Sequence, residues 1–230
     1  MGLFRNRGGA RHEGIDADFG QDDAASGRVT SGGVGPWDEA EAPEREEEML
    51  DCGALRLPVI EGASIQFTVD RNRDIVLGAV YVLGDSALQI QVFAAPKSRG
   101  IWDDVRADMI SSIAAQGGSS REEAGAYGQE IRAQMPIEGR RSINPVRYIG
   151  IDGARWLLRA TVTGKAAVDD NAARTLLHLV LDHTVVVRGE AAHPPRDILP
   201  LNIPKKSGRT EDERPKLELP KRGPELSEVR

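Results

Sequence analysis

The stretch VRYIGIDGARWLLRATVT, residues 146–163, predicts the central β-hairpin of this protein. Two β-rich runs flank Asp152-Gly153, a dipeptide typical of tight hairpin turns because both central positions of the favoured turn need a positive φ. Every second position of the second run is apolar: Ala154, Trp156, Leu158, Ala160 and Val162. The intervening positions carry Arg155, Arg159, Thr161 and Thr163, together with Leu157. This alternation predicts one buried face and one solvent-exposed face.

The pattern on both sides of this hairpin predicts further strands and two helices. The expected strands are 55–60, 65–69, 75–83, 88–93, a hairpin over 119–135 that turns near Gly125, and 183–188. One helix is expected to follow Ser98, a candidate N-cap, and to end at Gly117-Gly118, and the other to begin at Asp169 or Asp170. Their apolar stripes are Trp102, Val105, Met109, Ile110 and Ile113, and Ala172, Ala173, Leu176, Leu177 and Val180. Successive hairpins and two covering helices predict an α+β fold, a sandwich around a mainly antiparallel sheet.

The distribution of charge predicts one domain between two tails. Residues 1–50 have a net charge of −7, residues 51–189 are neutral, and residues 190–230 have a net charge of +1 and contain seven prolines. Segments with much charge and few large apolar residues do not bury enough surface to offset the entropy of ordering. We therefore expect a disordered acidic tail over 1–50, a single α+β domain over 51–189, and an extended, Pro-rich tail over 190–230.

The sequence contains no recognisable catalytic, cofactor-binding or metal-binding motif. The single cysteine, Cys52, excludes an intramolecular disulfide and a cysteine-cluster metal site. The sequence has no HExxH, GxSxG or GxxxxGK[ST] motif, and its neutral central part argues against nucleic-acid binding. No apolar run is long enough to span a bilayer. We therefore expect no cofactor, a cytoplasmic location and a role that is not enzymatic.

The polar face of the predicted sheet is one candidate binding surface. It is expected to carry Arg132, Gln134, Arg147, Arg155 and Arg159, and arginine suits bidentate contacts with carboxylates or phosphates. This face could be open, covered by the acidic tail or buried in a dimer. A second candidate is a docking motif of Pro36, Trp37 and Asp38, since an aromatic residue beside acids is typical of segments that fold on a partner. The alternative for this motif is that Trp37 packs against its own domain.

Four segments of the sequence resemble an actinobacterial family catalogued as domain of unknown function 3710. They are GPWD at 35–38, DCGALRLP at 51–58, the helix start from Trp102 to Arg106, and PVRYIGIDGARWLLR at 145–159. The resemblance covers roughly residues 35–204 and brings no catalytic or binding residues. It implies a cytosolic protein, and the order of strands and helices resembles the PsbP-type α/β/α sandwich, a fold used mostly for binding. Fold resemblance alone does not establish function.

Two functions from different classes follow as hypotheses. The first is a non-enzymatic interaction module that binds a protein partner through the Arg-bearing sheet face and the flexible tails. The alternative is a binder of, or an enzyme acting on, an anionic small metabolite or nucleotide that the same arginines hold. A concave pocket lined by those arginines favours the second hypothesis, and a flat face favours the first. The family resemblance also suggests a supporting role in nucleic-acid metabolism, which salt-sensitive DNA or RNA binding would test.

Overall fold

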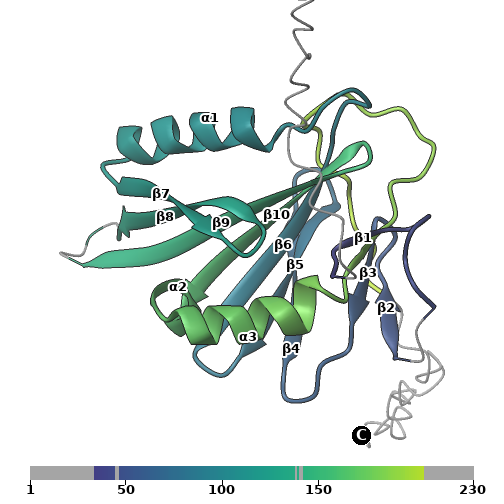
Figure 1. The fold of residues 1–230 in the computed structure, drawn as a ribbon, viewed down its shortest axis with the longest axis horizontal. Helices are drawn as coiled ribbons and strands as arrows, with labels where there is room; N and C mark the ends of the chain where they lie inside the picture. Colours follow the sequence, from purple (N-terminus) through teal and green to yellow (C-terminus); the bar gives the residue numbers. More distant parts are fainter. Residues whose placement is uncertain (1–33, 45–46, 138, 140–141, 205–230) are drawn as a thin grey trace, which may run out of the picture.

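The structure, a computed structural model, describes residues 34–44, 47–137, 139 and 142–204 of the chain, and its main element is a seven-stranded sheet (Figure 1). The strands are β4 (Ser64–Asp70), β5 (Ile75–Leu83), β6 (Ser86–Ala94), β7 (Ser119–Gly125), β8 (Gly128–Pro136), β9 (Ile143–Gly153) and β10 (Trp156–Gly164). Their order in the sheet is β4-β5-β6-β10-β9-β8-β7, and every neighbouring pair is antiparallel. The hairpin 146–163 thus supplies two of the three central strands, as the sequence predicts.

Helices cover both faces of this sheet. Helix α1 (Trp102–Ala115) lies on one face over β7, β8 and β9, and α2 (Lys165–Val168) and α3 (Asp170–Leu181) lie on the other (Figure 1). Two separate apolar clusters result. The larger joins α2 and α3 to residues such as Leu158 and Val162, and the smaller joins α1 to residues such as Ile131 and Leu157. The predicted α+β fold, a mainly antiparallel sheet with covering helices, is confirmed.

The turn of the central hairpin lies two residues later than the sequence predicts. Gly153 pairs with Trp156, so the turn residues are Ala154 and Arg155, and Arg155 has a φ of 69°. Asp152 and Gly153 are the last two residues of β9. Gly153 is needed there for another reason, because a Cβ at this position would lie 2.1 Å from ring atoms of Trp156.

Asp152, on β9, fixes the first turn of α1 from the sheet face that this helix covers. The helix begins after Ile101, which makes no side-chain cap, so the predicted N-cap at Ser98 is wrong. Instead, an Asp152 carboxylate oxygen accepts hydrogen bonds from the backbone N–H groups of Ile101 at 2.8 Å and Trp102 at 3.2 Å. Gly100 leaves room for this carboxylate, since a Cβ there would lie 2.4 Å from its Oδ2 atom. A carboxylate at this end of a helix satisfies free N–H groups and complements the helix dipole.

Replacing Asp152 by Ala is expected to destabilise the fold by about 1–2 kcal/mol, the usual cost of losing a helix cap. Asp152→Asn keeps an oxygen acceptor at the same place and is expected to lose less. Urea denaturation of the full chain measures both values. Equal losses for the two variants would contradict a capping role for the side-chain oxygen.

A second, smaller sheet packs at one end of the molecule. Its strands are β1 (Trp37–Asp38), β2 (Met49–Asp51), β3 (Leu55–Pro58) and β11 (Val185–Val186), in the order β1-β11-β3-β2. β1 and β11 pair in parallel, and the other pairs are antiparallel. The last predicted strand therefore exists in part, but it joins this sheet and not the central one: β11 pairs with β1 on one side and β3 on the other, and both of its valines are buried.

The predicted domain boundaries at residues 51 and 189 are too narrow. β1 and β2 lie before residue 51, and the segment 194–202 crosses the strand ends of the large sheet (Figure 1). There Leu199 N–H donates to Val92 O and Leu201 N–H to Val76 O, and both leucine side chains are buried. The rest of the predicted tails, residues 1–33 and 205–230, lies outside the described residues. None of the helices that the described residues form combines the length and apolar character needed to cross a membrane.

Candidate functional site

The predicted arginine surface is divided between the two faces of the sheet. Arg147 pairs with Val162 on β10 and with Arg132 on β8, whereas Arg159 pairs with Gly150 and Gln91. Residues paired across antiparallel strands share a face, and neighbours along a strand alternate between faces. Arg132, Gln134 and Arg147 therefore lie on the face covered by α2 and α3, and Arg159 lies on the α1 face. Arg155 lies in the hairpin turn. The prediction that these five residues form one surface is wrong.

The arginines on the α3 face are held by acidic residues of the same chain. Asp170 Oδ1 lies 2.5 Å from Arg147 Nη2 and 2.6 Å from Arg132 Nη2. Arg132 also lies 2.6 Å from Glu123, and Arg147 lies 3.5 Å from Glu130. Arg147 is only 5% exposed. These guanidinium groups fasten the first residue of α3 to β8 and β9, so they form an internal network and not an open surface.

The contribution of this network to folding stability depends on pH through the Asp170 carboxyl. Hydrogen bonds from Arg147 and Arg132 lower its pKa, so it contributes stability that is present above its unfolded pKa of about 3.9 and is lost as the pH falls through its folded pKa. We expect Asp170→Asn to reduce the loss of stability on acidification below about pH 4. Burial acts oppositely on Glu130, whose pKa it raises, so ionising Glu130 opposes folding as the pH rises. Urea midpoints from pH 3 to pH 7 measure how steeply stability falls with pH. The same fall in Asp170→Asn and in wild type would contradict the role given to the Asp170 carboxyl.

The candidate docking motif is part of the fold. Pro36 is buried, and Trp37 donates its indole N–H to Asp182 O at 3.0 Å. Asp38 Oδ2 accepts a hydrogen bond from the indole N–H of Trp156 at 2.8 Å. The structure therefore agrees with the alternative interpretation of this segment, in which Trp37 packs against its own domain. Since its polar and aromatic groups already have partners inside the chain, these three residues are not a free docking motif.

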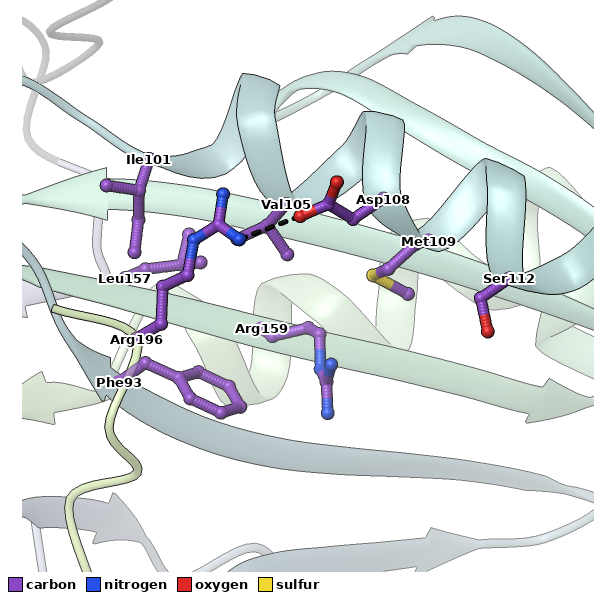
Figure 2. A pocket seen from close by; sticks show the side chains of 9 residues that line it. All are labelled: Phe93, Ile101, Val105, Asp108, Met109, Ser112, Leu157, Arg159 and Arg196. Carbon is purple, nitrogen blue, oxygen red and sulfur yellow. Dashed lines mark hydrogen bonds and ion pairs between the residues drawn. The ribbon is translucent and has the colours of Figure 1, made fainter.

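A cavity of about 310 Å³ lies between α1 and the sheet, and we call it the α1 cavity. Helix α1 forms one wall, β6 and β10 form the opposite wall, and the segment after Pro195 closes one side (Figure 2). The lining residues are Phe93, Ile101, Val105, Asp108, Met109, Ser112, Leu157, Arg159 and Arg196. Most of these are apolar, and the charged groups are two arginines and one aspartate. Of the five predicted surface residues, only Arg159 lines the α1 cavity.

Arg159 is held in this cavity by neutral groups. Its guanidinium carbon lies 4.9 Å from the centroid of the Phe93 ring, and its Nη2 donates to Gln91 Oε1 at 2.5 Å. Its Nε is buried and has no hydrogen-bond partner. No carboxylate in residues 34–44, 47–137, 139 or 142–204 forms an ion pair with it, and burial lowers its pKa. Removing part of a guanidinium from water without an opposite charge is unfavourable, and an anion bound beside Arg159 would offset this cost.

The second arginine of the cavity is already paired. Arg196 Nη1 lies 2.7 Å from Asp108 Oδ2, and the dashed line in Figure 2 marks this contact. The two side chains are 48% and 68% exposed, so the pair lies at the solvent side of the cavity. Arg196 comes from the segment that crosses the strand ends, where its N–H donates to Ala94 O at the end of β6 at 2.8 Å. The Arg196–Asp108 pair therefore connects this segment to α1 beside Arg159.

A larger cavity, of about 530 Å³, lies between α3 and the turn that joins β7 to β8. Its cation, Arg174, is exposed and donates to Asn171 Oδ1 at 3.3 Å, and three of its other polar groups contact one another. Tyr127 donates its hydroxyl to one carboxylate oxygen of Asp182, and His178 Nδ1 contacts the other. No group of three or more His, Cys, Asp or Glu side chains in the described part of the chain is arranged to hold a metal ion. The α1 cavity is the better candidate site, because Arg159 is half-buried there, its Nε atom is shielded from solvent, and no described carboxylate pairs with it.

Sequence reasoning found Arg159 but missed the rest of the cavity. Leu157 shares a face with Arg159, and an apolar residue on an otherwise polar face signals that something covers that face. Val105 and Met109 were assigned only to the helix core. Arg196 is 37 positions after Arg159 in a segment that composition assigned to a tail, so no local pattern connects the two.

Comparisons with known proteins give a family and one structural neighbour. The model of the family described as Protein of unknown function (DUF3710) matches residues 35–210. No protein among the curated ones matches the chain. The solution structure of cyanobacterial PsbP (CyanoP) from Synechocystis sp. PCC 6803 is similar over 66% of this chain and 99% of that chain, with 9% sequence identity and a TM-score of 0.38. A similarity of this extent carries no argument about function.

Proposed function

This chain belongs to the family described as Protein of unknown function (DUF3710), and we propose that it binds a small anionic molecule in the α1 cavity. The observation that supports the proposal is the environment of Arg159, a half-buried guanidinium that contacts an aromatic ring and an amide and pairs with no carboxylate of the described residues. Residues whose placement lowers the stability of the folded protein are typical of functional sites. The cavity gives an anion access to this group, and its apolar walls exclude the water that would screen the contact.

The hypothesis of a protein partner bound through the sheet face has less support. It required several arginines on one open face, and the pairing register separates Arg147 from Arg159. The arginines that do share a face are held by Asp170, Glu123 and Glu130. A protein partner and a cytoplasmic location stay predictions from the sequence.

Titration of the full chain with octanoate, citrate, adenosine 5′-monophosphate and inorganic phosphate tests the proposal. We expect at least one of these anions to raise the melting temperature, because a ligand that binds the native state stabilises it. Arg159→Met is expected to weaken that binding about 10- to 100-fold, the range for losing a hydrogen bond to a charged group. Arg121→Met is the matched control, since Arg121 lies on β7 and does not line the cavity.

The stability of Arg159→Met separates a binding role from a structural one. The variant loses the contact with the Phe93 ring and one hydrogen bond, but it also removes a half-buried charge that has no ion-pair partner among the described residues. We expect its free energy of unfolding to stay within about 1 kcal/mol of wild type, because apolar replacement of buried charges is often neutral or stabilising. No Arg159-dependent binding of any of the four anions would overturn the proposed function. A loss of several kcal/mol would assign Arg159 to the scaffold.

A further inference from the structure

We propose that the ligand of the α1 cavity is a monoanion with an apolar body, in the chemical class of medium-chain or aromatic monocarboxylic acids. This inference rests on the proposed function and adds to it the class of the ligand. Three properties of the cavity support it: the composition of its walls, its balance of charge and its size.

The walls of the cavity are suited to an apolar body. Val105 and Met109 lie four residues apart on α1, and Ile101, the residue just before the helix, continues the same spacing, so the three form one continuous stripe. Phe93 and Leu157 face this stripe from β6 and β10 (Figure 2). Ile101 and Leu157 are only 4% and 1% exposed, so they give the cavity a dry base. Met109 adds a flexible thioether that adapts to ligands of different shape.

The charges of the cavity leave room for one negative charge. Arg159 has no acidic partner in the described chain, whereas Arg196 is neutralised by Asp108. A carboxylate bound to Arg159 would therefore give each cation of the cavity lining one negative partner. A dianion would bring a second negative charge close to Asp108 with no further free cation in the lining, so it would have to displace Asp108 from Arg196.

The size of the cavity limits the ligand to a small molecule. A volume of about 310 Å³ is at the lower end of the range for ligand pockets, about 300–1,000 Å³. This space is suited to a chain of about eight carbons or a substituted aromatic ring, both at the small end of the ligands that such pockets hold. A nucleotide is disfavoured by the lack of stacking partners for its base, because among the described lining residues the only aromatic side chain, Phe93, already lies against Arg159.

Four probes of related shape test the inference by calorimetric titration of the full chain at pH 8. Octanoate has both features, 1-octanol lacks the charge, citrate lacks the apolar body, and octyl phosphate carries a second negative charge. We expect octanoate to bind about 10- to 100-fold more tightly than 1-octanol, and this difference to disappear in Arg159→Met. We expect citrate and octyl phosphate to bind more weakly than octanoate. Arg159-dependent binding of citrate or octyl phosphate with no binding of octanoate would overturn this inference and leave the proposed function standing.

A second variant tests the balance of charge. Asp108→Asn frees Arg196, so it should increase the affinity for octyl phosphate about tenfold more than the affinity for octanoate, in line with a charge-assisted contact. Asp104→Asn is the control, because Asp104 lies on the same helix and pairs with Arg99 outside the cavity. An equal gain for both ligands in Asp108→Asn would show that the Arg196–Asp108 pair does not select by ligand charge, and would overturn the assignment to monoanions.

Discussion

Replacing Gly150 by Ala is expected to destabilise the protein by about 3 kcal/mol, the upper part of the range for overpacking a core. A Cβ at position 150 would lie 2.0 Å, 2.2 Å and 2.6 Å from three atoms of the Trp102 indole. This ring is 5% exposed and donates its N–H to Gln129 O at 2.7 Å, so it has no free space into which to move. Urea denaturation followed by Trp fluorescence measures the change.

Gly62→Ala is the control for this experiment. Gly62 has a φ of +77°, and a Cβ there would meet no atom within 4 Å. Its replacement is expected to cost about 1–2 kcal/mol from the left-handed backbone alone. If backbone conformation dominated the cost, Gly62→Ala would be the more destabilised variant. If the clash with Trp102 dominates, as we expect, Gly150→Ala is the more destabilised one. Because Trp102 begins the helix that walls the α1 cavity, Gly150→Ala should also weaken ligand binding.

Replacing Trp156 by Ala is expected to cost about 3–5 kcal/mol, the usual loss for a buried Trp. Trp156 is 2% exposed, its ring lies over Gly153, and its indole N–H donates to Asp38. The substitution therefore opens a space in the larger apolar cluster and also removes the contact that fixes β1. Urea denaturation of the full chain measures the loss.

Asp38→Ala and Trp156→Phe separate the hydrogen bond from the packing. Asp38→Ala leaves the indole N–H without its acceptor and is expected to cost about 1–3 kcal/mol. Trp156→Phe keeps most of the ring, so adding Asp38→Ala to it should cost less than Asp38→Ala costs alone. Fully additive losses would indicate that the two side chains do not interact, and would reopen the interpretation of Asp38 as part of a free docking motif.

Local patterns predicted most of the large sheet. Alternation of apolar residues identified β8 and β10, and apolar residues at three- and four-residue spacing identified α1 and α3. These patterns are reliable because each strand or helix has to bury one side against the same sheet. The fold class followed from them, since successive hairpins pair as antiparallel neighbours.

The division of the arginines between two faces could also have been predicted. A turn centred on Asp152-Gly153 pairs Arg147 with Leu158, and Leu158 belongs to the apolar face opposite Arg159. The observed register pairs Arg147 with Val162, which leads to the same conclusion. Applying the pairing rule to both strands, and not only to the second, would have separated these two arginines.

Contacts between distant segments were beyond the reach of local patterns. Asp152 accepts hydrogen bonds at the start of a helix 50 residues earlier, whereas the residues around it in the sequence indicate only a turn. Arg196 and Leu199 lie in a Pro-rich segment whose composition indicates a tail, yet this segment packs across the ends of β5 and β6 and borders the cavity. The site therefore depends on tertiary contacts that composition and periodicity do not encode.

The parallel pairing of β1 with β11 determines when the protein can complete its fold during synthesis. Trp37 and its hydrogen-bond partner Asp182 are 145 residues apart. At about 5–20 residues per second, the ribosome adds Asp182 about 7–30 s after Trp37. Throughout this interval the strand that begins the described chain has no neighbour to pair with, while the hairpins between β4 and β10 can already form. Among the strands of the described residues, the first to be translated is thus among the last to pair, and Trp37 cannot make its contact with Asp182 until residue 182 has been added.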